Sequence, residues 1–149
     1  MKKKNVIKTR RYESPCGTLL LGSFGDKLCL CDWQIEKHRG HVDRRMKRIL
    51  NAEFEEGTSE VIKQAVRQLD EFFAGKRKVF DMPLLFVGTD FQKKVWRELL
   101  NIPFGETISY KEMARRIGLP TAVRAVANAN GANSVSIFAP CHRVIGSDN

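Results

Sequence analysis

Two short helical patterns joined by the turn Gly118-Leu119-Pro120 constrain the fold of this chain more than any other feature. The first helix can be capped by Thr107 or Ser109, and the second, over residues 122–130, by Thr121. Two short helices with a tight glycine-containing turn are typical of a helix-turn-helix. A plain helical hairpin packed in a core gives the same pattern, so the helices alone leave both interpretations open.

The second of these helices is built from small residues that are suited to close approach. Its small residues are Ala122, Ala125, Ala127 and Ala129, and Arg124 is the one long basic side chain among them. The whole chain of 149 residues has 26 Lys and Arg against 17 Asp and Glu, a formal net charge of +9. That balance favours a polyanionic partner such as nucleic acid, because binding releases counterions.

The first half of the chain predicts a small α/β unit. Residues 6–33 alternate as three short strands, separated by turn residues at 14–17 and at Gly25-Asp26. A helix follows Ser59 and ends at Gly75, and residues 79–87 are extended. The charge-dense residues 34–50 favour a solvated helix or loop over a specific DNA contact. We therefore expect an antiparallel sheet plus a helix.

The junction between the two halves falls at Gly88-Thr89. Thr89 with Gln92 three residues later forms a capping-box pattern, and Pro103-Phe104-Gly105 ends the helix that it starts. The fold class is therefore α/β, with an N-terminal unit over residues 1–87 and a helical C-terminal unit over residues 88–149.

The cysteine content indicates a reducing compartment. The four cysteines form no CxxC pair and no disulfide framework; they are Cys16, Cys29, Cys31 and Cys141. No apolar stretch follows the basic residues 2–4, so no signal peptide is expected, and no apolar run is long enough to span a membrane. We predict a cytoplasmic protein with no membrane partner. Because Cys29 and Cys31 alternate with leucines, we expect them to share one strand face as packing residues.

A possible nucleophile lies in the tetrapeptide Pro140-Cys141-His142-Arg143. A thiol becomes a nucleophile when it loses its proton, and a neighbouring imidazole can accept that proton. Pro140 favours a loop or strand end at this place rather than a helix. Arg143 can anchor the loop or supply positive charge. Two other interpretations remain open from these residues: a cysteine that only packs in the core, and a thiol hydrolase.

Several segments around this tetrapeptide resemble one known family. Residues 137–145 read IFAPCHRVI, and further matching segments precede them in family order and spacing: Phe91 with Val95-Trp96, residues 102–107, Ser109-Tyr110, residues 124–126 and Asn133. The chain thus resembles the O6-alkylguanine-DNA alkyltransferases, also called methylated-DNA–protein-cysteine methyltransferases. Residues 12–17 resemble the family's N-terminal hairpin. The resemblance implies a ribonuclease H-like N-terminal unit and a winged-helix-like C-terminal unit.

The resemblance implies direct-reversal repair of double-stranded DNA that contains O6-alkylguanine. The damaged base would be flipped out from the minor groove side, and its alkyl group would pass irreversibly to Cys141 in a single turnover. The implied protein needs no cofactor and acts as a monomer.

The same resemblance assigns roles residue by residue. His142 would deprotonate Cys141 through a water, and Tyr110 would donate its hydroxyl toward the departing guanine. The carbonyls of Cys141 and Val144 would accept the guanine amino group. The implied DNA-binding residues are Arg124 as the finger that replaces the flipped base, Ala125 beside it, Lys111 and Ser147 at phosphates, and Asn133 as the hinge between the recognition helix and the active-site loop.

The sequence departs from the family pattern in two ways. The pattern continues with a glutamate that orients the histidine and a glycine-rich loop that contains a tyrosine, whereas the sequence given stops at Asn149. We therefore expect weakened transfer, with a non-catalytic binder of alkylated DNA as the alternative. Some relatives bind zinc in the N-terminal unit, but the spacings here lie outside the usual zinc patterns, so we predict no metal site; the residues concerned are Cys16, Cys29, Cys31, His38 and His41.

Overall fold

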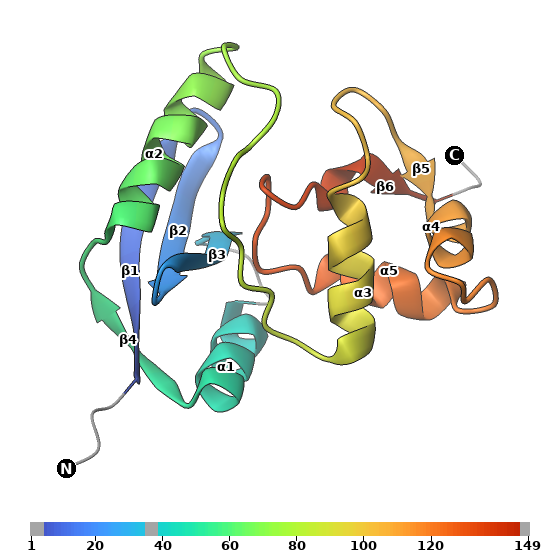
Figure 1. Cartoon of the computed structure of the whole chain (residues 1–149), viewed down its shortest axis with the longest axis horizontal. Coiled ribbons are helices and arrows are strands. Elements are labelled where there is room, and N and C mark those ends of the chain that lie inside the picture. Colours follow the sequence, from blue (N-terminus) through green and yellow to red (C-terminus); the bar gives the residue numbers. More distant parts are fainter. Residues whose placement is uncertain (1–4, 35–38, 147–149) are drawn as a thin grey trace.

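The computed structural model describes residues 5–34 and 39–146 (Figure 1). An N-terminal unit of sheet and helices, blue to green, lies beside a mainly helical C-terminal unit, yellow to red. A long connecting segment over residues 74–89 runs between the two units (Figure 1). Within the described ranges, no helix is long and apolar enough to cross a membrane.

The sheet has four strands in the order β3-β2-β1-β4. Strands β1 (Asn5–Ser14), β2 (Gly17–Phe24) and β3 (Lys27–Trp33) form the predicted antiparallel meander. Strand β4 (Ala52–Glu56) pairs in parallel with β1, so the sheet is mixed and not purely antiparallel as expected. The sequence AEFEE gave no strand signal, because β4 lies at an edge and most of its side chains are exposed.

Two helices cover opposite faces of this sheet. Helix α2 (Glu60–Phe73) begins after Ser59, whose hydroxyl accepts a hydrogen bond from the Ile62 amide at 3.2 Å, as predicted. It packs Ile62 and Leu69 on one face of the sheet. Helix α1 (Arg39–Leu50) packs Val42 and Met46 on the other face. Residues 39–50 of the charge-dense segment therefore form a helix with one apolar stripe.

The two strand cysteines do not share a face, contrary to the expectation from alternation. The pairing of β2 with β3 shifts register between Gly22 and Ser23, and Cys29 is the extra residue of this bulge. Cys29 therefore packs in the cluster under α1, whereas Cys31 packs in the cluster under α2. Both side chains are fully buried, as the packing interpretation requires.

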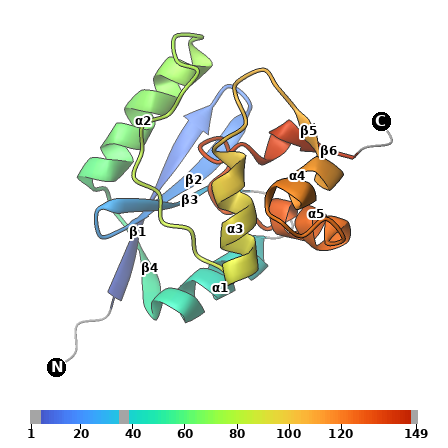
Figure 2. The ribbon, with the colours of Figure 1, turned by 45° about the vertical axis from the view of Figure 1, so that its right-hand side comes forward.

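The C-terminal unit is a helical bundle with a small ribbon of two strands (Figure 2). Its elements are α3 (Asp90–Leu99), β5 (Ile108–Ser109), α4 (Tyr110–Arg116), α5 (Val123–Gly131), the single 3-10 turn η1 (Cys141–Arg143) and β6 (Val144–Ile145). The predicted capping box at the start of α3 is present, with the Thr89 hydroxyl accepting from the Gln92 amide at 3.1 Å. Trp96 and Leu99 of α3, Met113 of α4 and Val126 of α5 form one buried core.

The free edge of β3 holds the two units together. Near its start, Leu28 pairs in parallel with Leu84 of the connecting segment. Near its end, Cys31 pairs in parallel with Val135, six residues before Cys141. The Cys31 amide donates to the Ser134 carbonyl at 2.8 Å, and the Ser136 amide donates to the Cys31 carbonyl at 2.7 Å. Pairing with the edge strand β3 thus holds the segment that leads to Cys141.

Gly88 leaves no room for a side chain, which gives a first prediction. A Cβ atom at this position would lie 2.5 Å from Gln92 Oε1 and 2.6 Å from the Trp96 ring. We expect Gly88→Ala to lower the free energy of unfolding by about 1–3 kcal/mol, the usual cost of overpacking. Denaturant unfolding followed by circular dichroism measures this. Gly131→Ala is the control, because a Cβ there meets nothing within 4 Å; equal stability of the two variants would contradict the prediction.

Candidate active site and DNA interface

Cys141 is the first residue of the turn η1 and carries a free, half-buried thiol. The sequence favoured a loop or strand end, and the structure instead forms one 3-10 turn that leads directly into β6. Arg143 anchors this turn, because its Nη1 donates to the Ile102 carbonyl at 2.6 Å. Its guanidinium also lies over the Phe104 ring. The turn is therefore fixed against the end of α3.

The carbonyl of Cys141 is already engaged within the protein. Asn130 Nδ2 donates to it at 3.1 Å, and the Val144 amide donates to it as well. A carbonyl oxygen has two lone pairs, so both are engaged in the free protein, and the role of this carbonyl as acceptor for the guanine amino group stays a prediction. Val144 lies on β6 with its side chain buried, and its carbonyl remains a prediction as the acceptor.

Asn133 is a buried structural residue and not a surface contact for DNA, which corrects its assignment. Only 3% of it is exposed. Its Nδ2 donates to the Ala139 carbonyl at 2.9 Å, and its Oδ1 accepts from the Val135 amide at 3.0 Å. These bonds hold a strained loop, since Ile137 has a φ of 74° that β-branched residues rarely adopt. The hinge role that the resemblance implies for Asn133 stays a prediction.

The pKa shifts of the thiol and the imidazole have physical causes in the site. Burial raises the pKa of Cys141, while hydrogen bonding from Asn133 lowers it and the charge of Asp32 raises it. The pKa of His142 is lowered by burial of part of its ring and then by the charge of Arg143. At neutral pH the thiol is therefore protonated and the imidazole is neutral, so the pair needs a proton transfer before the sulfur can react.

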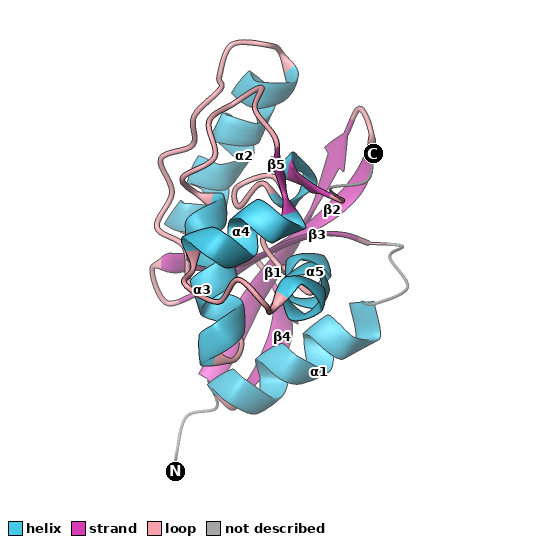
Figure 3. Cartoon of the chain, turned by 90° about the vertical axis from the view of Figure 1, so that its right-hand side faces the viewer, coloured by secondary structure: helices cyan, strands magenta, loops and turns pink. Residues whose placement is uncertain are grey.

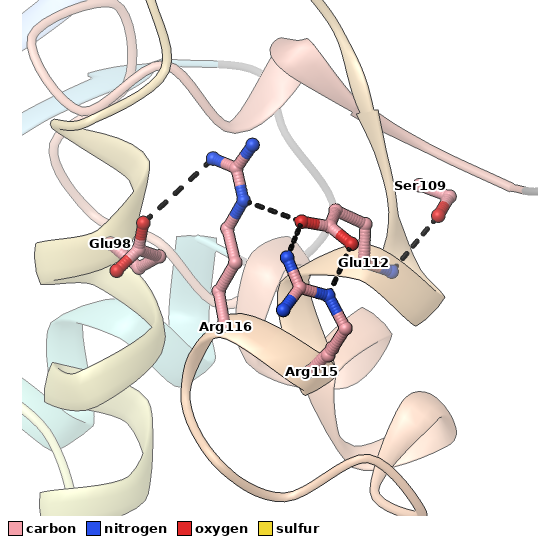
Figure 4. A network of polar contacts seen from close by, with 5 residues as sticks. All are labelled: Glu98, Ser109, Glu112, Arg115 and Arg116. Atoms are coloured by element: carbon pink, nitrogen blue, oxygen red, sulfur yellow. Dashed lines mark hydrogen bonds and ion pairs between the residues drawn. The ribbon is translucent and has the colours of Figure 1, made fainter.

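The first helix of the helix-turn-helix is rigidly braced (Figure 4). Ser109 caps α4, because its hydroxyl accepts from the Glu112 amide at 2.9 Å, so Ser109 and not Thr107 is the cap. Glu112 accepts hydrogen bonds from Arg115 Nε at 2.7 Å and from Arg116 Nε at 2.9 Å. These bonds lower the pKa of Glu112 to about 2. Arg116 also reaches Glu98 of α3.

Helix α4 presents two of the implied site residues next to each other. Tyr110 is its first residue and is half-buried against the C-terminal core, whereas Lys111 is exposed. The turn to α5 passes through Gly118, whose φ of +79° favours glycine. The predicted helix-turn-helix geometry is therefore present in α4 and α5, seen from the side in Figure 3.

Helix α5 exposes Arg124, Ala125 and Asn128 on its outer side, and it buries Val126 and Ala129. In the described part of the chain, Arg124 makes no hydrogen bond or ion pair, so its guanidinium is available to a ligand. Thr121 does not cap this helix, contrary to expectation. The N-cap residue is Ala122, which has no side chain able to bond the first amides.

The remaining sequence-predicted residues do not form a metal site in the described ranges. Cys16 is exposed on the β1–β2 turn, whereas Cys29 and Cys31 are buried. His38 and Ser147 lie outside the described residues. Asn130 was not predicted from the sequence, since nothing local marks it; its contact with the Cys141 carbonyl arises only from packing.

Comparisons with known proteins decide the family. Residues 7–86 match the family description "6-O-methylguanine DNA methyltransferase, ribonuclease-like domain", and residues 90–149 match the DNA binding domain of the same family. A methylated-DNA–protein-cysteine methyltransferase of Methanosarcina barkeri is 45% identical over 136 residues, which cover 91% of this chain and 80% of that protein. The chain belongs to the O6-methylguanine DNA methyltransferase family.

Further relatives of this methyltransferase family agree in sequence and fold. The constitutive enzyme of Bacillus subtilis is 41% identical over 142 residues, covering 92% of this chain and 79% of that protein. The crystal structure of the Mycobacterium tuberculosis O6-methylguanine methyltransferase matches with a TM-score of 0.80 and 40% identity, over 95% of this chain and 80% of that one. A structure of the mycobacterial protein in complex with DNA matches with a TM-score of 0.78 and 40% identity, over 96% of this chain and 80% of that one.

Proposed function

We propose that this chain repairs O6-alkylguanine in damaged DNA by transferring the alkyl group to Cys141. The observation that carries the proposal is a free, half-buried thiol next to His142, on a loop that Asn133 ties to the end of α5. The N-terminal unit, over residues 1–87, supplies strand β3, which pairs with the loop before Cys141. The C-terminal unit, over residues 88–149, supplies the DNA-binding helices and the nucleophile.

The chemistry is one displacement at the alkyl carbon. His142 accepts the thiol proton of Cys141 through a water, and the thiolate attacks the carbon as the carbon–O6 bond breaks. The guanine departs with the electron pair of that bond, and the Tyr110 hydroxyl stabilises the charge that develops on it. The product is a thioether on Cys141. The thioether is a stable product, so each molecule reacts once.

Base flipping brings the alkyl group to the thiol. We propose that α5 enters the minor groove with Ala125 against it, because small side chains permit close approach. Arg124 fills the space that the flipped guanine leaves, against an unstacking cost of about a few kcal/mol. Lys111, and by the family pattern Ser147, contact phosphates. We further propose a monomer, and a reducing compartment such as the cytoplasm, because Cys141 must remain a free thiol.

Intact-mass spectrometry tests this function directly. The chain is incubated with a duplex that contains O6-methylguanine, and the adduct is mapped by peptide analysis. A gain of one methyl group on Cys141 supports the proposal. No gain, with binding to the damaged duplex retained, supports the alternative of a non-catalytic binder. The observation that favours this alternative is that the His142 ring has no orienting hydrogen bond within the described residues, and an unoriented base is a weaker catalyst.

The pH dependence of transfer follows from the site. His142 must be neutral to accept the proton. Because its pKa is lowered, the ring stays neutral at pH values below the usual pKa of a histidine. We expect the single-turnover rate to be flat around neutral pH and to fall only as the pH drops through this lowered pKa. Mass spectrometry of reactions quenched at set times measures this rate. The range is about pH 5–9, which brackets the ordinary titration of histidine. In His142→Phe the rate should instead rise continuously with pH, since the raised pKa keeps Cys141 protonated. His41→Ala serves as the control.

A further inference from the structure

Arg45 of helix α1 reaches across to the C-terminal unit. Its Nη2 donates to the Ala132 carbonyl at 2.9 Å, a contact between residues 87 apart in the sequence. Its guanidinium also lies over the Trp96 ring, 5.3 Å from the ring centroid. Helix α1 and the end of α5 lie side by side in Figures 1 and 3.

These contacts meet the carboxyl end of the recognition helix. Ala132 is the C-cap residue of α5 and directly precedes Asn133. Trp96 Nε1 donates to the Ala129 carbonyl at 2.8 Å, so Arg45 and Trp96 together bond the carbonyls of the last turn of α5. The last carbonyls of a helix have no partner within it and carry partial negative charge, which favours a cation at this end.

Fold stability alone does not explain this arginine. Arg45 is half-buried, and its Nε has no hydrogen-bond partner within the described residues. Burial lowers the pKa of Arg45, and the charge of Asp32, which is 1% exposed on β3, raises it. Burying such a charge is often no more stabilising than a well-packed apolar side chain of similar size. What a guanidinium adds is a fixed geometry between the groups that it contacts.

We propose that Arg45 is a positioning residue for alkyl transfer: it fixes the carboxyl end of α5 against the N-terminal unit. The inference rests on the proposed function. Arg124 extends from α5, and the loop that follows Ala132 leads to Cys141 while its residues 134–136 pair with β3. A fixed end of α5 therefore sets the distance from the DNA-reading face to the sulfur. The N-terminal unit thus contributes to the reaction through α1 as well as β3.

The test compares Arg45→Met, which keeps an unbranched apolar stem but lacks the charge, with Arg45→Lys, which keeps the charge. We expect Arg45→Met to lower the single-turnover rate on saturating O6-methylguanine duplex roughly 10- to 100-fold, the usual cost of a small misplacement of reacting groups. Its affinity for undamaged duplex should stay close to that of the wild type. Arg45→Lys should restore most of the rate, because an ammonium can still meet the Ala132 carbonyl. The control is Arg44→Met, at an exposed position on the same helix.

Thermal unfolding and amide hydrogen exchange separate positioning from simple loss of structure. In Arg45→Met, exchange should rise at residues 129–135 while the folded fraction at the assay temperature stays unchanged. A wild-type rate in Arg45→Met, a rate loss that only follows unfolding, or a failure of lysine to restore the rate would each overturn the proposal. If the wild-type chain transfers no methyl group, the proposed function fails, whereas the exchange result still decides whether Arg45 fixes α5.

Discussion

Cys141→Ala is expected to abolish methyl transfer and to leave DNA binding intact. In the proposed mechanism the sulfur of Cys141 forms the new bond to the alkyl carbon, so without it the alkyl group has no acceptor. The residue lies on η1, whereas the exposed side chains that are predicted to bind DNA lie on α4 and α5. Intact-mass spectrometry after incubation with O6-methylguanine duplex, together with a gel-shift titration, measures both properties in one preparation.

Cys16→Ser is the matched control for this experiment. Cys16 is the one exposed cysteine in the described part of the chain, and so the most accessible competing thiol. Cys16→Ser should gain one methyl group as the wild type does. A methyl gain that persists in Cys141→Ala and disappears in Cys16→Ser would show that the nucleophile has been misassigned.

Arg124→Ala is expected to slow transfer far more than it weakens DNA binding. If Arg124 fills the space of the flipped guanine, its removal leaves an unstacking cost of a few kcal/mol uncompensated, which corresponds to a rate loss of about 100-fold. Binding to undamaged duplex loses one cationic contact among several, so its dissociation constant should rise by only about 10-fold or less. Single-turnover kinetics and fluorescence of a 2-aminopurine beside the lesion measure transfer and flipping separately.

The control for Arg124 is Arg67→Ala, at an exposed position on α2 in the N-terminal unit. It removes the same charge from the protein and should change neither the rate nor the dissociation constant. Lys111→Ala should weaken binding to damaged and undamaged duplexes alike, as a phosphate contact does. Equal losses of rate and affinity in Arg124→Ala would contradict the finger assignment and leave Arg124 as another phosphate contact.

The features that the sequence predicted well are those whose causes lie within a few residues. Ser59 and Thr89 cap their helices through hydrogen bonds that span three positions, and both caps are present. Gly118 provides the positive φ that the turn between α4 and α5 needs. The prediction of Cys141 as the nucleophile rests on local sequence as well, because Pro140, Cys141 and His142 are neighbours in the chain, and it stays a prediction.

The errors concern features that depend on distant partners. Thr121 has the right chemistry for a cap, but the chain turns so that Ala122 takes that place. Cys29 and Cys31 lie on different faces of the sheet because the pairing of β3 with β2 shifts register at Cys29. Strand β4 owes its pairing to β1, whose paired residues lie 47 positions earlier in the sequence, and its own residues have weak strand preference.

The sequence by itself determined the family and the helix-turn-helix, and it predicts Cys141 as the reacting sulfur, since each rests on short contiguous motifs. Only the tertiary structure decided how that sulfur is held. Burial raises the pKa of Cys141 and hydrogen bonding with Asn133 lowers it, and β3 pairs with the loop that carries this residue. Arg45 meets Ala132 only in the folded protein. Contacts of this kind join residues that no local pattern relates, because burial and pairing are properties of the whole packed chain.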